Sequence, residues 1–161
     1  MDFKTADLCD AHSDHVQIAS PGLRDFGGQA RFSGRIVTVK VFEDNSLVKD
    51  MLDRDGQNGV LVVDGGGSLR CALLGDLLAA KAVSNHWRGI IVHGCIRDSA
   101  DIATMPLGVK ALATHPLKSV KRGVGEVNRP ISFAGVTFRP RDYVYADEDG
   151  VIVSAEPLLG E

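Results

Sequence analysis

Apolar residues in the first half of the chain alternate between patterns typical of strands and patterns typical of helices. The β-branched, partly alternating segment Arg35–Phe42 predicts a half-buried strand, and the uniformly apolar segment Gly59–Val63 predicts a fully buried one. An apolar stripe with helical spacing lies between them: Leu47, Val48, Met51 and Leu52. Asn45 or Ser46 can cap this helix, and Gly56 can end it. The pattern therefore predicts a strand-helix-strand unit.

A second unit of the same kind follows along the chain. Leucine and alanine residues predict a helix over Asp76–His86, and Gly89 opens a buried strand over Ile90–His93. This order is typical of parallel β-α-β units, whose ligands collect in the crevice outside the carboxyl ends of the strands. A shorter helix is predicted near the N-terminus, over Thr5–His12, with Thr5 as its cap.

The last third of the chain has short β-type segments and few helical patterns. These segments are Val109–Ala113, Ile131–Phe138, Asp142–Tyr145 and Gly150–Val153. They favour antiparallel or mixed pairing over a pure doubly wound sheet. No repeat, low-complexity tract or linker divides the sequence. We therefore expect one α/β domain over residues 1–161, in which parallel β-α-β units are closed by a β-rich C-terminal layer.

Composition and charge narrow the class of protein. Hydrophobic residues make up 44% of the 161 positions and charged residues 24%, as in a globular domain with a conventional core. The formal net charge is -3, so binding to a phosphate backbone would need a local basic patch. Only two short basic clusters are present, Lys118/Lys121/Arg122 and Arg139/Arg141. Such clusters are more often solvated loops or strand edges than binding sites. Without a signal-like N-terminus or a membrane-length apolar run, we expect a cytoplasmic protein that binds neither membranes nor nucleic acid directly.

Several reactive residue types have no decisive pattern. Cys9, Cys71 and Cys95 are odd in number and lack CxxC spacing, which favours reduced thiols over disulfides or a zinc site. His93 lies two positions before Cys95, so a Cys-His nucleophile pair is one interpretation and core packing is the other. The glycine-rich segment Asp64–Gly67 lacks the spacing of a phosphate loop or a dinucleotide fingerprint, and it predicts a turn beside a neighbouring site.

Two short motifs carry the candidate chemistry, Gly75–Leu78 and Arg97-Asp98. A helix that begins in the tetrapeptide would offer its first backbone amides to an anion. Arg97 can bind a carboxylate through two hydrogen bonds, and Asp98 is a hard oxygen ligand suited to Mg²⁺ or Mn²⁺. Each motif alone more often has a structural role. Gly75 can be a turn before an acidic residue that stabilises the first turn of the helix, and Arg97-Asp98 can be an exposed ion pair at a strand end. The helix and strand between them, however, could bring both motifs to one edge of a sheet.

A longer set of motifs resembles a known family. They are LCDAH at 8–12, FGG at 26–28, FEDN at 42–45, VLVVDGGGSLRCALLGDLLA at 60–79, GCIRD at 94–98 and FAGVTF at 133–138. Together they resemble the regulator of ribonuclease activity A family, which also contains the class II 4-hydroxy-4-methyl-2-oxoglutarate aldolases. The resemblance extends from Leu8 to about Pro157. It implies a swivelling β-β-α fold, like that of phosphohistidine domains, assembled as a homotrimer whose rings can pair.

The resemblance also assigns roles to residues. Asp76, Arg97 and Asp98 match the D-x20-R-D signature of the aldolase branch. It implies that the amides of four residues hold the carboxylate of a 2-oxo acid: Gly75, Asp76, Leu77 and Leu78. Arg97 would bind the substrate and the developing enolate, Asp98 would anchor Mg²⁺ or Mn²⁺, and Asp76 would position or deprotonate a water or hydroxyl. Longer members take a carboxylate from a neighbouring subunit's C-terminal region, for which Glu156 and Glu161 are the candidates in this chain.

The expected function is therefore divalent-metal-dependent cleavage of 4-hydroxy-4-methyl-2-oxoglutarate to two pyruvates. Loss of CO₂ from oxaloacetate would pass through the same pyruvate enolate. The resemblance leaves two alternatives: a protein that binds and regulates a ribonuclease E-type endoribonuclease, and a sensor that binds a 2-oxo acid without turnover.

Overall fold

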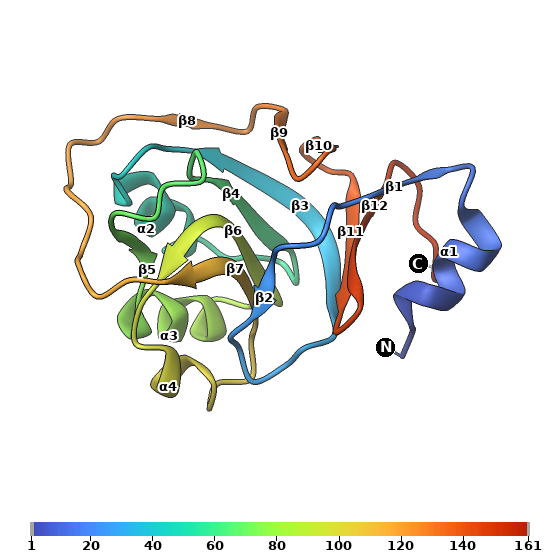
Figure 1. The fold of residues 1–161 in the computed structure, drawn as a ribbon, viewed down its shortest axis with the longest axis horizontal. Helices are drawn as coiled ribbons and strands as arrows, with labels where there is room; N and C mark the ends of the chain where they lie inside the picture. Colours follow the sequence, from blue (N-terminus) through green and yellow to red (C-terminus); the bar gives the residue numbers. More distant parts are fainter. Residues whose placement is uncertain (1, 161) are drawn as a thin grey trace.

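The computed structural model describes residues 2–160 and has a mixed α/β fold with one large sheet and few helices (Figure 1). The elements in chain order are α1 (Thr5–His12), β1 (Val16–Ile18), β2 (Arg24–Asp25), β3 (Phe32–Lys40), α2 (Ser46–Leu52), β4 (Val60–Asp64), β5 (Ala72–Leu74), α3 (Asp76–Ser84), β6 (Gly89–Ile96), α4 (Ser99–Ile102), β7 (Gly108–Thr114), β8 (Glu126–Val127), β9 (Ile131–Phe133), β10 (Val136–Phe138), β11 (Tyr143–Asp147) and β12 (Gly150–Ser154). The strand order of the large sheet is β1-β12-β11-β3-β4-β6-β7-β2, with β5 paired to β6 and β8 paired to β3.

The parallel β-α-β units expected from the sequence are present. Strands β3, β4, β6 and β7 run parallel, and α2 and α3 pack against one face of the sheet they form. On that face Val39, Val63 and Val92 are buried with the apolar sides of the two helices. Burial of this apolar face is what holds such short helices in place, because isolated helices of their length are unstable in water.

The C-terminal layer is β-rich, as predicted, and it joins the parallel sheet through the long strand β3. The first residues of β3 pair antiparallel with β11, whereas Ile36–Lys40 pair parallel with β4. The segment predicted as one strand over Ile131–Phe138 is a hairpin of β9 and β10. Its turn residues Ala134 and Gly135 have φ of 51° and 75°, the left-handed conformation that tight hairpin turns require.

The predicted cap of α1 was wrong, and that of α2 was correct only in its position. The N-cap of α1 is Lys4, and the Thr5 amide and hydroxyl both donate to the buried carboxylate of Asp147, at 2.7 and 2.6 Å. Asp147 thereby fixes the N-terminal helix to β11. In α2 the N-cap residue is Asn45, one of the two predicted, but its side chain makes no capping hydrogen bond, and the helix ends at Leu52 and not near Gly56. Gly56 lies beyond that end, where a Cβ would come within 2.5 Å of the Trp87 ring.

Strand β5 was not predicted from the sequence, and it decides where the candidate motifs lie. It pairs with β6 beyond the end of β4, matching Ala72 with Cys95 and Leu74 with Ile96. Three residues are too few for an alternating pattern, so no local signal identifies the strand. Within residues 2–160, no helix is long and apolar enough to cross a membrane.

Candidate functional site

The two candidate motifs lie side by side at the carboxyl ends of β5 and β6. Gly75 follows β5 as the N-cap of α3, and Arg97-Asp98 follows β6 and leads into α4. The Arg97 amide donates to the Leu74 carbonyl oxygen at 2.8 Å, which ties the two strand ends together. The expectation that both motifs reach one edge of the sheet is confirmed.

Asp98 has a left-handed backbone conformation, with φ 57° and ψ 39°. Aspartate adopts this conformation more readily than most residues, and such outliers cluster at functional sites. Here the Asp98 Oδ2 atom accepts the Asp76 amide at 3.0 Å. That hydrogen bond lowers the pKa of Asp98 against the opposing effect of burial, and Arg97 lowers it further. Asp98 is therefore a carboxylate at neutral pH.

Gly75 allows this close approach. A Cβ atom at Gly75 would lie 2.8 Å from Asp98 Oδ2 and 3.4 Å from Arg97 Nε. The first distance is shorter than any normal carbon-oxygen contact, so a larger residue would displace the Asp98 carboxylate. The glycine of the tetrapeptide is thus required by packing around the carboxylate and the guanidinium.

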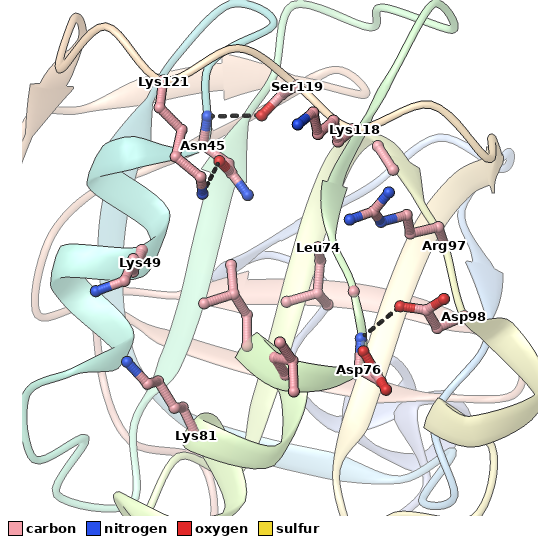
Figure 2. Close-up of a pocket in the computed structure, with 14 residues that line it drawn as sticks. Asn45, Lys49, Leu74, Asp76, Lys81, Arg97, Asp98, Lys118, Ser119 and Lys121 are labelled. Atoms are coloured by element: carbon pink, nitrogen blue, oxygen red, sulfur yellow. Dashed lines mark hydrogen bonds between the residues drawn. The ribbon is translucent and has the colours of Figure 1, made fainter.

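The motifs form one wall of a cavity of about 270 Å³, which we call the anion pocket (Figure 2). It is lined by Asn45, Lys49, Ala72, Leu74, Gly75, Asp76, Leu77, Leu78, Lys81, Arg97, Asp98, Lys118, Ser119 and Lys121. Figure 2 shows Lys49 and Lys81 on the side of the pocket opposite Arg97 and Asp98. Four lysines and one arginine thus face two carboxylates, an excess of positive charge that favours anionic ligands.

The first turn of α3 contributes backbone donors to the same pocket. The amides at the start of a helix have no intrahelical acceptor, and the helix dipole makes this end favourable for an anion. The Asp76 amide already donates to Asp98, so the next amides, those of Leu77 and Leu78, are the donors available to a ligand. Leu77 is 78% exposed, so burial of its side chain does not explain why a leucine is at this position.

Residues 117–124, which we call the strap, close the pocket from above, and buried Asp44 holds them. Its Oδ2 accepts the amides of Arg122 and Val124 at 2.9 and 3.2 Å, while its Oδ1 accepts the amide and hydroxyl of Ser46. Burial raises the pKa of Asp44, but these hydrogen bonds outweigh it and lower the pKa to about 2. Asp44 therefore fixes the strap to the start of α2.

Asn45 continues this network into the pocket. Its amide donates to Ser119 Oγ at 3.1 Å, and its Oδ1 accepts Lys121 Nζ at 3.1 Å. On the other wall, Lys49 and Lys81 both bind Asp53. Sequence reasoning missed Asn45 and these lysines as site residues, and it treated the strap lysines as a solvated cluster. The cluster was interpreted from neighbours in the sequence alone, whereas the pocket joins four separate segments of the chain.

The oxygen donors at this site fit a hard divalent cation. Mg²⁺ is usually held by one or two carboxylates, with waters and substrate oxygens completing its coordination. Asp98 is an exposed, ionised carboxylate with Asp76 beside it, which matches that donor set. Within residues 2–160, no group of three or more acidic, histidine or cysteine side chains is placed to hold a metal ion. Glu156 is absent from the pocket lining, and Glu161 lies outside the described residues.

The remaining candidates have other roles in the structure. Cys95 is 1% exposed, and burial raises the pKa of its thiol, so it is not an activated nucleophile. The His93 ring stacks on Phe133 with 4.7 Å between centroids. Of the two interpretations of His93 and Cys95, core packing is therefore the one that the structure supports. All three cysteines are free thiols.

Comparisons with known proteins show the family of this chain. The Aldolase/RraA model of the RraA-like family matches residues 5–153. A protein of Laribacter hongkongensis named "Putative 4-hydroxy-4-methyl-2-oxoglutarate aldolase" is 65% identical over 159 residues, which cover 99% of this chain and all of that protein. A protein of the same name from Azotobacter vinelandii is 60% identical over 98% of both chains.

Two solved structures are similar over nearly their full length. One, titled an S-adenosylmethionine:2-dimethylmenaquinone methyltransferase from Geobacillus kaustophilus, has a TM-score of 0.97 and 50% identity and covers 99% of both chains. The other, the RNA-processing inhibitor RraA from Thermus, has a TM-score of 0.95 and 45% identity and covers 99% of this chain and 97% of its own.

Proposed function

Since this chain belongs to the Aldolase/RraA family, we propose that it is a divalent-metal-dependent lyase that cleaves 4-hydroxy-4-methyl-2-oxoglutarate into two pyruvates. We extend the proposal to oxaloacetate decarboxylation, because both reactions leave the same pyruvate enolate. The observation that carries it is the convergence of Asp76, Arg97, Asp98 and the start of α3 on one cationic pocket. Two carboxylates on the substrate match the positive excess of that pocket.

Each residue of the site has a role that its position supports. The Leu77 and Leu78 amides and the Arg97 guanidinium bind the carboxylate of the 2-oxo acid. Arg97 is half-buried and its Nη1 donates to the Pro116 carbonyl oxygen at 3.4 Å, so the guanidinium stays beside the pocket. Negative charge grows on the departing pyruvate, and Arg97 stabilises it there. To Asp76, which lines the pocket, we assign the removal of the proton from the substrate hydroxyl or from a water.

Asp98 would hold Mg²⁺ or Mn²⁺ together with waters. When bound, the cation supplies a Lewis acid that stabilises negative charge on the carboxylate and keto oxygens of the substrate. We also propose the homotrimeric assembly, the cytoplasmic location and the swivelling β-β-α class that the family resemblance implied. In such an assembly Glu156 or Glu161 of a neighbouring copy would supply the further carboxylate.

A coupled assay tests the lyase proposal. Pyruvate release from each substrate is followed with lactate dehydrogenase, with Mg²⁺ or Mn²⁺, after EDTA, and after the metal is restored. Arg97→Lys keeps the charge but loses the planar fork, so kcat/KM should fall by about 10-fold or more. Arg139→Lys, in an exposed loop, is the control and should leave it unchanged. Absence of metal-dependent pyruvate from both substrates would refute the proposal, and calorimetric binding without product would support the sensor alternative.

Regulation of an endoribonuclease is the second candidate, favoured by the likeness to the RNA-processing inhibitor RraA. The test is co-purification with a ribonuclease E-type enzyme and an RNA cleavage assay with increasing amounts of this protein. Inhibition that persists in Asp98→Ala would separate this role from the lyase site. Lack of both binding and inhibition would count against it.

A further inference from the structure

A second groove opens at the same edge of the sheet, on the face away from α2 and α3. Its volume is about 620 Å³, which is within the range of small-molecule sites. Its floor is a row of three residues in register on adjacent strands: Lys40 of β3 pairs with Asp64 of β4, and Asp64 pairs with His93 of β6. Each follows a valine that faces the helices, so strand alternation directs the row to the opposite face.

The glycine-rich turn after β4 shapes this groove. A Cβ at Gly66 would lie 2.8 Å from the Phe42 ring, and a Cβ at Gly67 would lie 3.2 Å from the His93 ring. The Gly66 amide donates to Asp64 Oδ1 at 2.9 Å. The turn thus fits closely against two side chains of the groove and positions a third, which gives the Asp64–Gly67 motif a role separate from the anion pocket.

Asp64 and His93 are neighbours in the floor but form no hydrogen bond with each other. His93 Nδ1 is buried and has no hydrogen-bond partner within residues 2–160, and its distance to Asp64 Oδ1 is 4.0 Å, too long for a hydrogen bond. Burial lowers the pKa of His93, against the opposing effect of Asp64, so the ring is neutral at pH 7 and one ring nitrogen can accept. The exposed part of the Asp64 carboxylate is therefore the acceptor that the floor offers to a cationic ligand, with the His93 ring beside it.

The walls and the charge narrow the ligand further. Phe42 is 56% exposed and Val124 is 65% exposed, and both line the groove. One lysine faces two carboxylates, those of Asp64 and Glu126, so the charge is opposite in sign to that of the anion pocket. Apolar walls and a lining with a net negative charge suit a flat apolar ring with a cationic group, and disfavour a dicarboxylate.

We propose that this groove is a second ligand site, which takes a small ring compound bearing a protonated amine. The ring packs against Phe42 and Val124, and the amine donates to Asp64. The proposal does not depend on the lyase function, because no residue of the groove lines the anion pocket.

The test is a titration of the ¹⁵N-labelled full chain with tryptamine, followed by NMR. Indole-3-acetate, which has the same ring and the opposite charge, is the matched probe. Tryptamine should shift the amide signals of Gly66 and Gly67 and the ring signals of His93, and indole-3-acetate should bind at least 10-fold more weakly. Equal binding of both probes, no binding, or shifts at Leu77 and Leu78 instead would overturn the proposal.

Variants locate the binding. Asp64→Asn should weaken tryptamine at least 10-fold, and Phe42→Ala, an exposed change that leaves the core intact, should weaken it about 5-fold. Leu69→Ala removes an equally exposed side chain outside the groove and should change nothing. Unchanged affinity in Phe42→Ala would refute the site. Light scattering that shows a smaller assembly in Phe42→Ala would assign this face to a second copy of the chain, and would also refute it.

Discussion

The anion pocket and the second groove lie at the same edge of one parallel sheet, yet their charges are opposite. Five cations and two carboxylates line the anion pocket, whereas one lysine and two carboxylates line the groove. The anion pocket lies on the helix-covered side, where α2, α3 and the strap supply its lysines. The groove lies on the other side, where the strands themselves supply the charged row. One sheet edge can therefore carry two sites with different ligands, because strand alternation separates their side chains.

The largest expected effect separates the two sites by chemistry. Asp98→Ala removes the carboxylate that we assign to the metal, so kcat should fall by about 100-fold or more. Binding of tryptamine to the groove should be unchanged. The measurement is the coupled pyruvate assay, with Asp101→Ala as the control, an exposed acid of α4 outside the pocket. Full activity in Asp98→Ala would contradict the assignment of this residue.

Gly75→Ala tests whether the anion pocket depends on close packing. The added methyl would lie 2.8 Å from Asp98 Oδ2 and must displace it, so kcat/KM should fall by about 10-fold to 100-fold. Thermal stability should change little, because Gly75 has φ of -130°, which alanine adopts easily. Gly150→Ala, where no atom lies within 4 Å of the new Cβ, is the control. Unaltered kinetics would show that Asp98 need not occupy this position.

Asp44→Asn tests the strap, which supplies Lys118, Ser119 and Lys121 to the anion pocket and Val124 to the groove. The folded pKa of about 2 lies below the ordinary value of 3.8, so Asp44 stabilises the fold above pH 4. That contribution is about 2 kcal/mol, and it is lost as the pH falls from about 4 to 2. Asp44→Asn should lower the free energy of unfolding by this amount at pH 7 and flatten its acid dependence. Urea unfolding at several pH values measures it, and Asp50→Asn, on the exposed side of α2, should retain the wild-type profile.

The smallest expected effect tests the difference in charge between the anion pocket and the groove. Lys81→Met removes one cation from the anion pocket, and KM for the dicarboxylate should rise by about 2-fold to 5-fold with kcat unchanged. Lys40→Met removes a cation from the groove and should leave KM unchanged. Steady-state assays at two ionic strengths measure KM and kcat of both variants. An equal rise in the two variants would show that overall charge, not the pocket, attracts the substrate.

Prediction from the sequence succeeded where a periodic pattern or a specific motif exists. The segments Gly59–Val63 and Ile90–His93 are apolar, apart from His93, because both faces of their strands are largely covered. Each lies within an observed strand or extends it by one residue. Prediction failed where the conformation of a residue depends on a partner that is distant in the sequence. Thr5 was expected as a cap but binds Asp147, which is 142 residues away. The three-residue strand β5 is specified by its pairing with β6 and not by its own sequence.

The sequence by itself determined the family, the parallel units and the D-x20-R-D motif, because these are properties of order and spacing along the chain. Only the tertiary structure decided how the motif becomes a pocket. Strand β5 places Gly75 against Asp98, the left-handed Asp98 turns its carboxylate to the start of α3, and Asp44 holds the strap lysines above them. The structure alone also revealed the second groove, since Lys40, Asp64 and His93 become neighbours only when three strands pair in register.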